Sequence, residues 1–103
     1  MTSATILLVE NKEDVRNLVR GVLTACGYHV LAAANGQDAL RLTVQFAGRI
    51  DLLVTDVVMP GMSGREVALL LAPAHPTMKA LYLPQPFTAD GLAQQVREIL
   101  ESP

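Results

Sequence analysis

The feature that most constrains this chain is residues 50–64, which read IDLLVTDVVMPGMSG. The first part is a short apolar run, typical of a strand that is buried on both faces of a parallel sheet. The run ends at Asp56, and a turn rich in proline and glycine follows. Ser63 and Glu66 then have the spacing of a capping box. The sequence therefore predicts a strand, a carboxylate and a helix in close succession.

The position of this carboxylate indicates a function. In open α/β sheets, ligands bind beyond the carboxyl ends of the parallel strands, and Asp56 stands at such an end. Asp51 stands at the opposite end of the same strand and is interpreted as a surface residue. Asp56 is the first candidate functional residue. The alternative interpretation is a solvated carboxylate at a strand end.

The rest of the chain alternates short apolar runs with amphipathic segments. The other predicted strands are residues 5–9, 28–33 and 78–83. The first predicted helix ends at Gly27 and has an apolar stripe formed by Val15, Leu18, Val19, Val22, Leu23 and Cys26. A second helix follows the Asn35-Gly36 turn and contains Ala39, Leu40, Val44 and Phe46. A third covers residues 65–72, and the last helix has Thr88 as its N-cap. This alternation predicts a parallel sheet with helices on both faces.

The bulk composition favours one domain over residues 1–103, with half of its residues hydrophobic. A net charge of −2 without a basic block gives no support for nucleic-acid binding. No apolar run is long enough for a membrane span, and the first residues do not resemble a signal peptide. The single cysteine, Cys26, excludes an internal disulfide and is interpreted as a small core residue. We expect a cytoplasmic protein.

Several stretches together resemble the receiver domains of two-component response regulators. They are ILLVEN, EDVRNLVRGVLTACGY, ANGQDAL, DLLVTDVVMPGMSG and PQPFT, and they cover nearly the whole chain. The D-x-x-M-P-x-M-x-G core is the most specific of them. The resemblance implies a flavodoxin-like, doubly wound α/β fold and a signalling module rather than an enzyme.

The resemblance also implies a phosphoryl-transfer site. Asp56 matches the aspartate that accepts a phosphoryl group from a histidine kinase or phosphotransfer protein, and a downstream protein partner would read the result. Glu10 and Asn11 match the acidic pair that holds Mg²⁺ together with Asp56. Val58 matches the residue whose backbone carbonyl completes the magnesium site.

Two substitutions depart from the family pattern at this site. Asn11 replaces an aspartate, which removes one negative charge, so we expect Mg²⁺ binding to be weak or lost; its alternative role is a helix N-cap. Gln85 replaces the family lysine and brings no charge to a phosphoryl oxygen; its alternative role is a simple loop residue. The resemblance implies a cis peptide bond before Pro86.

The third departure is a deletion. By comparison with the family, about one helix–strand unit, roughly twenty residues, is absent after Leu83. No hydroxyl residue stands where the phosphate-sensing one is expected, because Thr88 is explained as a cap. Tyr82 is interpreted as a packing residue, with a relocated switch as the alternative. The sheet is then shortened to about four strands with an exposed edge, so we expect a homodimer or swapped arrangement with residues 78–87 in the interface.

Other residues offer little support for further chemistry. His29 and His75 have no metal-ligating partners at a suitable spacing. Met59 and Met62 are expected to pack the turn after Asp56. The absence of G-x-G-x-x-G and G-K-[ST] motifs makes a nucleotide-binding enzyme a poor alternative.

Three hypotheses for function follow from these observations. The first is a signalling switch that is phosphorylated on Asp56, with impaired charging or switching. The second is a pseudo-receiver, which acts as a protein-interaction module without phosphorylation. The third is a decayed fragment with no selected activity. The intact turn after Asp56 favours the first hypothesis, whereas Asn11, Gln85 and the lost helix–strand unit favour the second.

Overall fold

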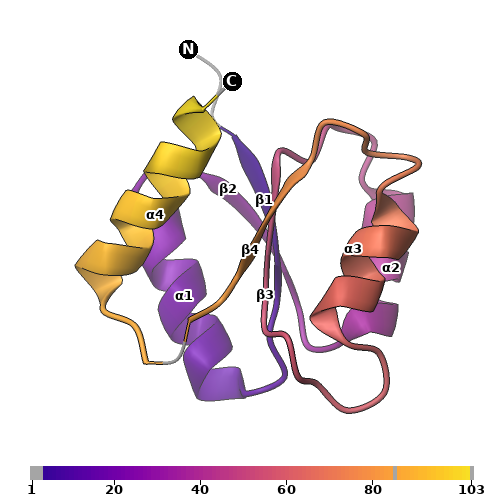
Figure 1. Ribbon diagram of the computed structural model, residues 1–103, viewed down its shortest axis with the longest axis horizontal. Helices are drawn as coiled ribbons and strands as arrows, with labels where there is room; N and C mark the ends of the chain where they lie inside the picture. Colours follow the sequence, from indigo (N-terminus) through magenta and orange to yellow (C-terminus); the bar gives the residue numbers. More distant parts are fainter. Residues whose placement is uncertain (1–3, 85, 103) are drawn as a thin grey trace.

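The computed structural model describes residues 4–84 and 86–102, and in these residues four strands and four helices alternate (Figure 1). The strands are β1 (Thr5–Val9), β2 (His29–Ala33), β3 (Leu52–Thr55) and β4 (Lys79–Tyr82). The helices are α1 (Glu13–Ala25), α2 (Gly36–Gln45), α3 (Gly64–Leu71) and α4 (Ala89–Glu101). The predicted order of elements is confirmed.

The four strands form one parallel sheet in the order β2-β1-β3-β4. β1 and β3 are central, and β4 is an edge strand that pairs with β3 alone. This confirms the predicted sheet of about four strands. The sheet therefore has two edge strands, β2 and β4, and β4 is the one next to the proposed deletion.

Helices cover both faces of the sheet, α1 and α4 on one face and α2 and α3 on the other (Figure 1). Successive residues of β1 alternate between the two layers, so Ile6 and Leu8 pack under α1 and α4, while Leu7 and Val9 pack under α2 and α3. All five residues of β1 are buried. This two-sided burial explains why the central strands read as continuous apolar runs.

The helix starts follow the capping signals in the sequence. The Glu66 amide donates to Ser63 Oγ at 3.2 Å and the Ser63 amide to Glu66 Oε1 at 3.2 Å, which confirms the capping box of α3. Thr88 caps α4 by accepting the Gly91 amide at 3.0 Å, as predicted. At the other end of a helix, Gly27 has φ +95 and follows α1, which confirms its role as terminator.

Three apolar side chains are misplaced by the helical pattern. Cys26 is exposed, so its interpretation as a core residue is wrong. It lies at the C-cap, where the chain has already left the helical stripe. Leu18 is 55% exposed and Val44 is 86% exposed, although both belong to the predicted apolar stripes. Each helix faces a narrow sheet, which buries only part of a wide stripe.

No helix in the described residues combines the length and the apolar character that a membrane span requires.

Candidate functional site

The structure brings Glu10 and Asp56 to the same edge of the sheet. β1 and β3 are neighbours, and Val9 is paired with Thr55. The two acids follow these paired residues directly, and the Asp56 amide donates to the Val9 carbonyl at 3.2 Å. Two carboxylates from separate strands therefore lie at adjacent carboxyl ends, where parallel sheets place their ligands.

Glu10 is the unusual member of this pair because it is fully buried. Its Oε2 accepts the Lys12 amide at 3.0 Å, and Arg16 Nη1 donates to its backbone carbonyl at 2.9 Å. Its Oε1 is buried and has no hydrogen-bond partner within the described residues. A buried carboxylate oxygen without a partner carries a large desolvation cost, which a bound cation would offset.

Asp56 is half-buried, and its backbone is held tightly. Thr55 Oγ1 donates to the Asp56 carbonyl oxygen at 2.9 Å. A Cβ at Gly64 would lie 2.2 Å from that same oxygen, so α3 begins too close to Asp56 for any residue but glycine. The amide of Gly64 closes the loop by donating to the Val57 carbonyl at 3.0 Å. The loop after Asp56 is thus fixed at both ends.

Two methionines anchor the middle of this loop, as predicted. Met59 is buried at 7% exposure and belongs to the core under α2 and α3. Met62 packs against the start of α2, where a Cβ at Gly36 would lie 2.8 Å from the Met62 sulfur. The loop between Asp56 and α3 is therefore part of the packed structure.

The other expected magnesium ligands are more exposed. The side chain of Asn11 is exposed, and Val58 is 82% exposed. The alternative role of Asn11 as an N-cap is wrong, because the N-cap position of α1 is Lys12 and no side chain caps it. The Lys12 amide donates to the Glu10 carboxylate, and α1 begins at the next residue, Glu13.

The donor chemistry at this edge fits a hard cation. The described residues contain no group of three or more His, Cys, Asp or Glu side chains that could hold a metal. Glu10 and Asp56 nevertheless provide carboxylate oxygens, and Asn11 an amide oxygen, which are the ligand types that Mg²⁺ prefers. The ligand roles of Glu10, Asn11, Asp56 and the Val58 carbonyl stay predictions.

The segment after β4 supplies apolar residues where the family has a hydroxyl. Leu83 is buried, its amide donates to the Thr55 carbonyl at 2.8 Å, and the exposed Pro84 follows it. Gln85, and with it the peptide bond between Gln85 and Pro86, lies outside the described residues. Thr88 caps α4.

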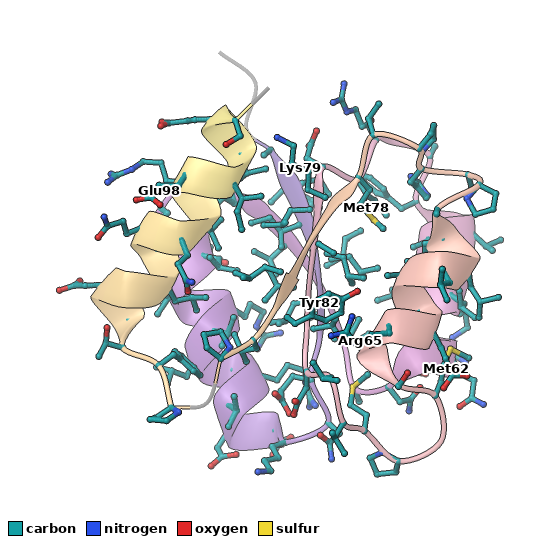
Figure 2. All side chains as sticks on the ribbon, in the orientation of Figure 1. Met62, Arg65, Met78, Lys79, Tyr82 and Glu98 are labelled. Atoms are coloured by element: carbon teal, nitrogen blue, oxygen red, sulfur yellow. The ribbon has the colours of Figure 1, made fainter. Side chains whose placement is uncertain are left out.

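Arg65 is a residue near the site that the sequence analysis did not single out. Its guanidinium lies over the ring of Tyr82, 4.8 Å from the centroid (Figure 2). The sequence shows a cation in the first turn of a helix, where the helix dipole disfavours it, but it does not indicate which group the cation contacts. The contact agrees with the interpretation of Tyr82 as a packing residue.

The remaining candidates have structural partners. The His29 ring stacks on Phe46 with centroids 5.8 Å apart, and the His75 amide donates to the Leu71 carbonyl at 3.0 Å. Asp51 is half-buried and accepts the Thr5 amide at 2.8 Å, and Arg49 pairs with it at 3.0 Å. The interpretation of Asp51 as only a surface residue is therefore wrong, because it ties the starts of two strands together.

Comparison with known proteins agrees with this architecture. The family model of the response regulator receiver domain matches residues 6–101. The sensor kinase CckA of Brucella abortus is 35% identical over 120 residues, which covers 96% of this chain and 13% of that kinase. The alignment is longer than the 103-residue chain, so the kinase has residues without a counterpart here.

Solved structures show the same fold. The receiver domain of the hybrid histidine kinase CckA has a TM-score of 0.79 at 34% identity, with coverage of 95% of this chain and 100% of that chain. The response regulator TrrA of Thermotoga maritima, solved in complex with Mg²⁺ and BeF, has a TM-score of 0.74 at 25% identity, with coverage of 93% and 98%. The four-stranded chain thus superimposes on complete receiver domains over most of its length.

Proposed function

Because the chain belongs to the response regulator receiver family, we propose that it is a two-component signalling module in which Asp56 accepts a phosphoryl group from a histidine kinase or phosphotransfer protein. The observation that carries this proposal is the placement of Asp56 and the buried Glu10 at adjacent strand ends, where Glu10 Oε1 has no partner in the described residues. The hydrogen bond from the Lys12 amide uses Oε2 alone and gives no structural role to the buried Oε1.

The protein's own residues have defined tasks in this proposal. The Asp56 carboxylate is the nucleophile, and the close approach of Gly64 to the Asp56 backbone holds it at the end of β3. Glu10, Asn11, Asp56 and the Val58 carbonyl would hold Mg²⁺. When bound, Mg²⁺ neutralises negative charge on the phosphoryl oxygens.

We expect charging and switching to be weaker than in a complete receiver. Asn11 supplies one negative charge fewer for the cation, and Gln85 supplies no cation for the phosphoryl group. Leu83 and Pro84 offer no hydroxyl to sense it. The proposal therefore includes low magnesium affinity and an impaired conformational response.

Intact-mass measurement after incubation with Mg²⁺ and a small phosphodonor tests the proposal. We expect a gain of about 80 daltons, the mass of a phosphoryl group on an aspartate. Asp56→Asn should lose this gain, whereas Asp90→Asn, in the exposed first turn of α4, should keep it. An unchanged mass in wild type, under conditions that modify an ordinary receiver domain, would instead support a phosphorylation-independent interaction module.

Thermal denaturation with and without Mg²⁺ tests the ligand set separately. A ligand that binds only the folded state raises Tm, so Mg²⁺ should stabilise the wild type. Glu10→Gln should reduce that rise, because the variant lacks the charge of the buried carboxylate. An equal rise in both proteins would exclude Glu10 as a ligand.

Self-association is also part of the proposal. β4 is an edge strand and residues 78–87 include it, which supports the expected contact between two copies at this edge. Sedimentation velocity over the micromolar range measures this directly. A clean monomer would contradict it.

A further inference from the structure

The outer edge of β4 carries a short row of backbone groups that do not face the sheet. The amides of Lys79 and Leu83 donate to the carbonyls of Asp51 and Thr55 at 3.0 and 2.8 Å. Successive amides of a strand point to opposite sides, so those of Ala80 and Tyr82 point away from β3. Neither amide donates in any hydrogen bond of the described residues.

This open row has sharp limits. On one side the Met78 amide is already used, because it donates to the His75 carbonyl at 3.1 Å. On the other side Pro84 has no amide hydrogen to donate. The free backbone donors of this edge are therefore the amides of Ala80 and Tyr82, one on each side of Leu81.

One common protection of an edge strand, a lysine whose charge is free, is missing from β4. A lysine on an edge strand normally disfavours pairing with another chain. The only lysine of β4 is Lys79, and its Nζ donates to the Ile99 carbonyl at 2.9 Å and to the Ser102 carbonyl. Because this ammonium group is hydrogen-bonded to carbonyls at the end of α4, its charge does not oppose pairing at the outer side of β4.

A mostly apolar groove, whose lining also includes Arg65 and His75, runs beside the same strand on the face covered by α3. It has a volume of about 380 Å³, and its walls include Leu69 of α3, which is 74% exposed, and Met78 and Tyr82 next to the edge. Figure 2 shows Met78 and Tyr82 pointing from the β4 side toward α3. Apolar surface thus continues from the groove to the open edge.

We propose that β4 pairs in antiparallel fashion with β4 of a second copy of this chain, around a twofold axis at Leu81. Ala80 then faces Tyr82 of the second copy, and the reverse pair forms on the other side of the axis. Each pair exchanges two backbone hydrogen bonds, so all the outward-facing groups of both strands are satisfied. This inference rests on the proposed self-association and is independent of phosphorylation of Asp56.

The side chains of the strand are self-complementary in this register. The large ring of Tyr82 lies opposite the small side chain of Ala80 of the second copy, on the groove face of the sheet. On the other face, Leu81 of each copy meets its counterpart beside the core under α1 and α4. Lys79 comes opposite Leu83 of the second copy, so no like charges face each other.

A second copy is favoured over an unrelated peptide by this symmetry. The two free donors stand at equal distances along the strand on either side of Leu81, and a twofold axis there matches each donor with an acceptor. An isologous contact also doubles every favourable interaction from one surface patch. The partner that fits the open edge of β4 is therefore β4 of a second copy of the chain.

Sedimentation velocity on two substitutions of one residue tests the edge. Wild type should sediment at twice the 11.1 kDa chain mass in the micromolar range. Ala80→Pro removes an outward-facing donor but no bond to β3, so it should give a folded monomer, as judged by far-UV circular dichroism. Ala80→Val keeps the donor and should remain a dimer.

These measurements separate the inference from the proposal on which it rests. A monomeric wild type would overturn both. A dimeric wild type with an equally dimeric, folded Ala80→Pro would leave self-association intact and overturn pairing through β4. The phosphorylation of Asp56 is read by intact mass and is unaffected by either outcome.

Disulfide trapping tests the register without a loss of hydrogen bonds. In a Cys26→Ser background, Leu81→Cys should form a dimer under mild oxidation, because residues facing each other across a twofold axis lie within disulfide distance. Leu70→Cys, at a position of α3 that is 55% exposed, is the matched control and should stay largely monomeric. Trapping at Leu70 and not at Leu81 would overturn the register.

Discussion

β3 and β4 are neighbouring parallel strands of four residues each, with very different surroundings. Each follows an apolar pattern, and Leu53 of β3 pairs with Ala80 of β4. All four residues of β3 are buried, whereas Ala80 is exposed and the other three residues of β4 are only partly buried. The local pattern predicts both strands, but it does not predict how deeply each one is buried.

The difference comes from what lies beyond each strand. β3 has β1 on one side and β4 on the other, and helices cover both its faces. β4 has only β3, and the groove beside α3 leaves part of one face uncovered. The open side of β4 is the side next to the deletion that the sequence analysis places after Leu83.

The carboxyl ends of the two strands differ in the same way. β3 ends in Asp56, and the loop after it is fixed by Met59 and by the close contact at Gly64. β4 runs into Leu83 and Pro84, which offer no group for phosphoryl recognition. Under the proposed function, the chain retains the residues around the acceptor Asp56 and lacks a hydroxyl after β4 that would respond to a phosphoryl group.

Truncation of one leucine in each strand is the strongest test of this contrast. Leu53→Ala should lower the free energy of unfolding by about 2–5 kcal/mol, because Leu53 is fully buried in β3. Leu81→Ala should cost less than about 2 kcal/mol, because Leu81 is only partly buried in β4. Urea denaturation at low protein concentration measures both values. Equal costs would show that the two strands are equally enclosed.

A glycine pair tests how firmly the loop after Asp56 is fixed. Gly64→Ala should destabilise the fold by about 1–3 kcal/mol, because its Cβ would lie 2.2 Å from the Asp56 carbonyl oxygen. Gly21→Ala is the control, since a Cβ there meets nothing within 4 Å in the middle of α1. It should stabilise the protein by about 0.5–1 kcal/mol.

Thermal or urea denaturation of both glycine variants gives the comparison. A neutral Gly64→Ala would mean that the start of α3 can move away from Asp56 at little cost. The loop after Asp56 would then not be rigidly held, and it would no longer differ in this respect from the segment after β4.

Much of the fold could be predicted because periodicity and capping are local. The capping box at Ser63 and the strand of residues 5–9 follow from neighbouring residues alone, and the structure confirms both. Cys26 and Val44 were misplaced because their burial depends on where a helix ends and what covers it. Those are tertiary facts that a periodic pattern does not contain.

For the candidate site, the sequence predicted which residues lie at the carboxyl ends of the strands. The resemblance to receiver domains implied that Glu10 and Asp56 lie together, and the pairing of Val9 with Thr55 places them at adjacent strand ends. The contact between Arg65 and Tyr82 was not predicted, because it joins a helix start to a strand seventeen residues later across the uncovered face. Glu10 Oε1 has no partner among the described residues, and this could not be predicted either, because it depends on the surroundings of the side chain.

The smallest expected effect is a change in the pH dependence of stability, and it concerns Tyr28 beside β2, the edge of the sheet opposite β4. Tyr28 comes directly before β2 and packs against the core under α1 and α4. Burial raises the pKa of the Tyr28 phenol above its ordinary value of 10.0, Cys26 and Glu101 raise it further, and Arg97 lowers it. A raised pKa in the folded state means that stability is fully present below pH 10 and falls as the pH rises above that value, because the unfolded chain releases the proton first.

Tyr28→Phe should therefore flatten the loss of stability between neutral pH and alkaline pH. The urea midpoint of the variant should change less than that of wild type when the pH is raised through 10, the ordinary phenol value. Tyr82→Phe is the control, since it removes a phenol from the other edge strand. If Tyr28→Phe followed the same pH profile as wild type, the edge at β2 would be as open as the edge at β4, and only the centre of the sheet would count as enclosed.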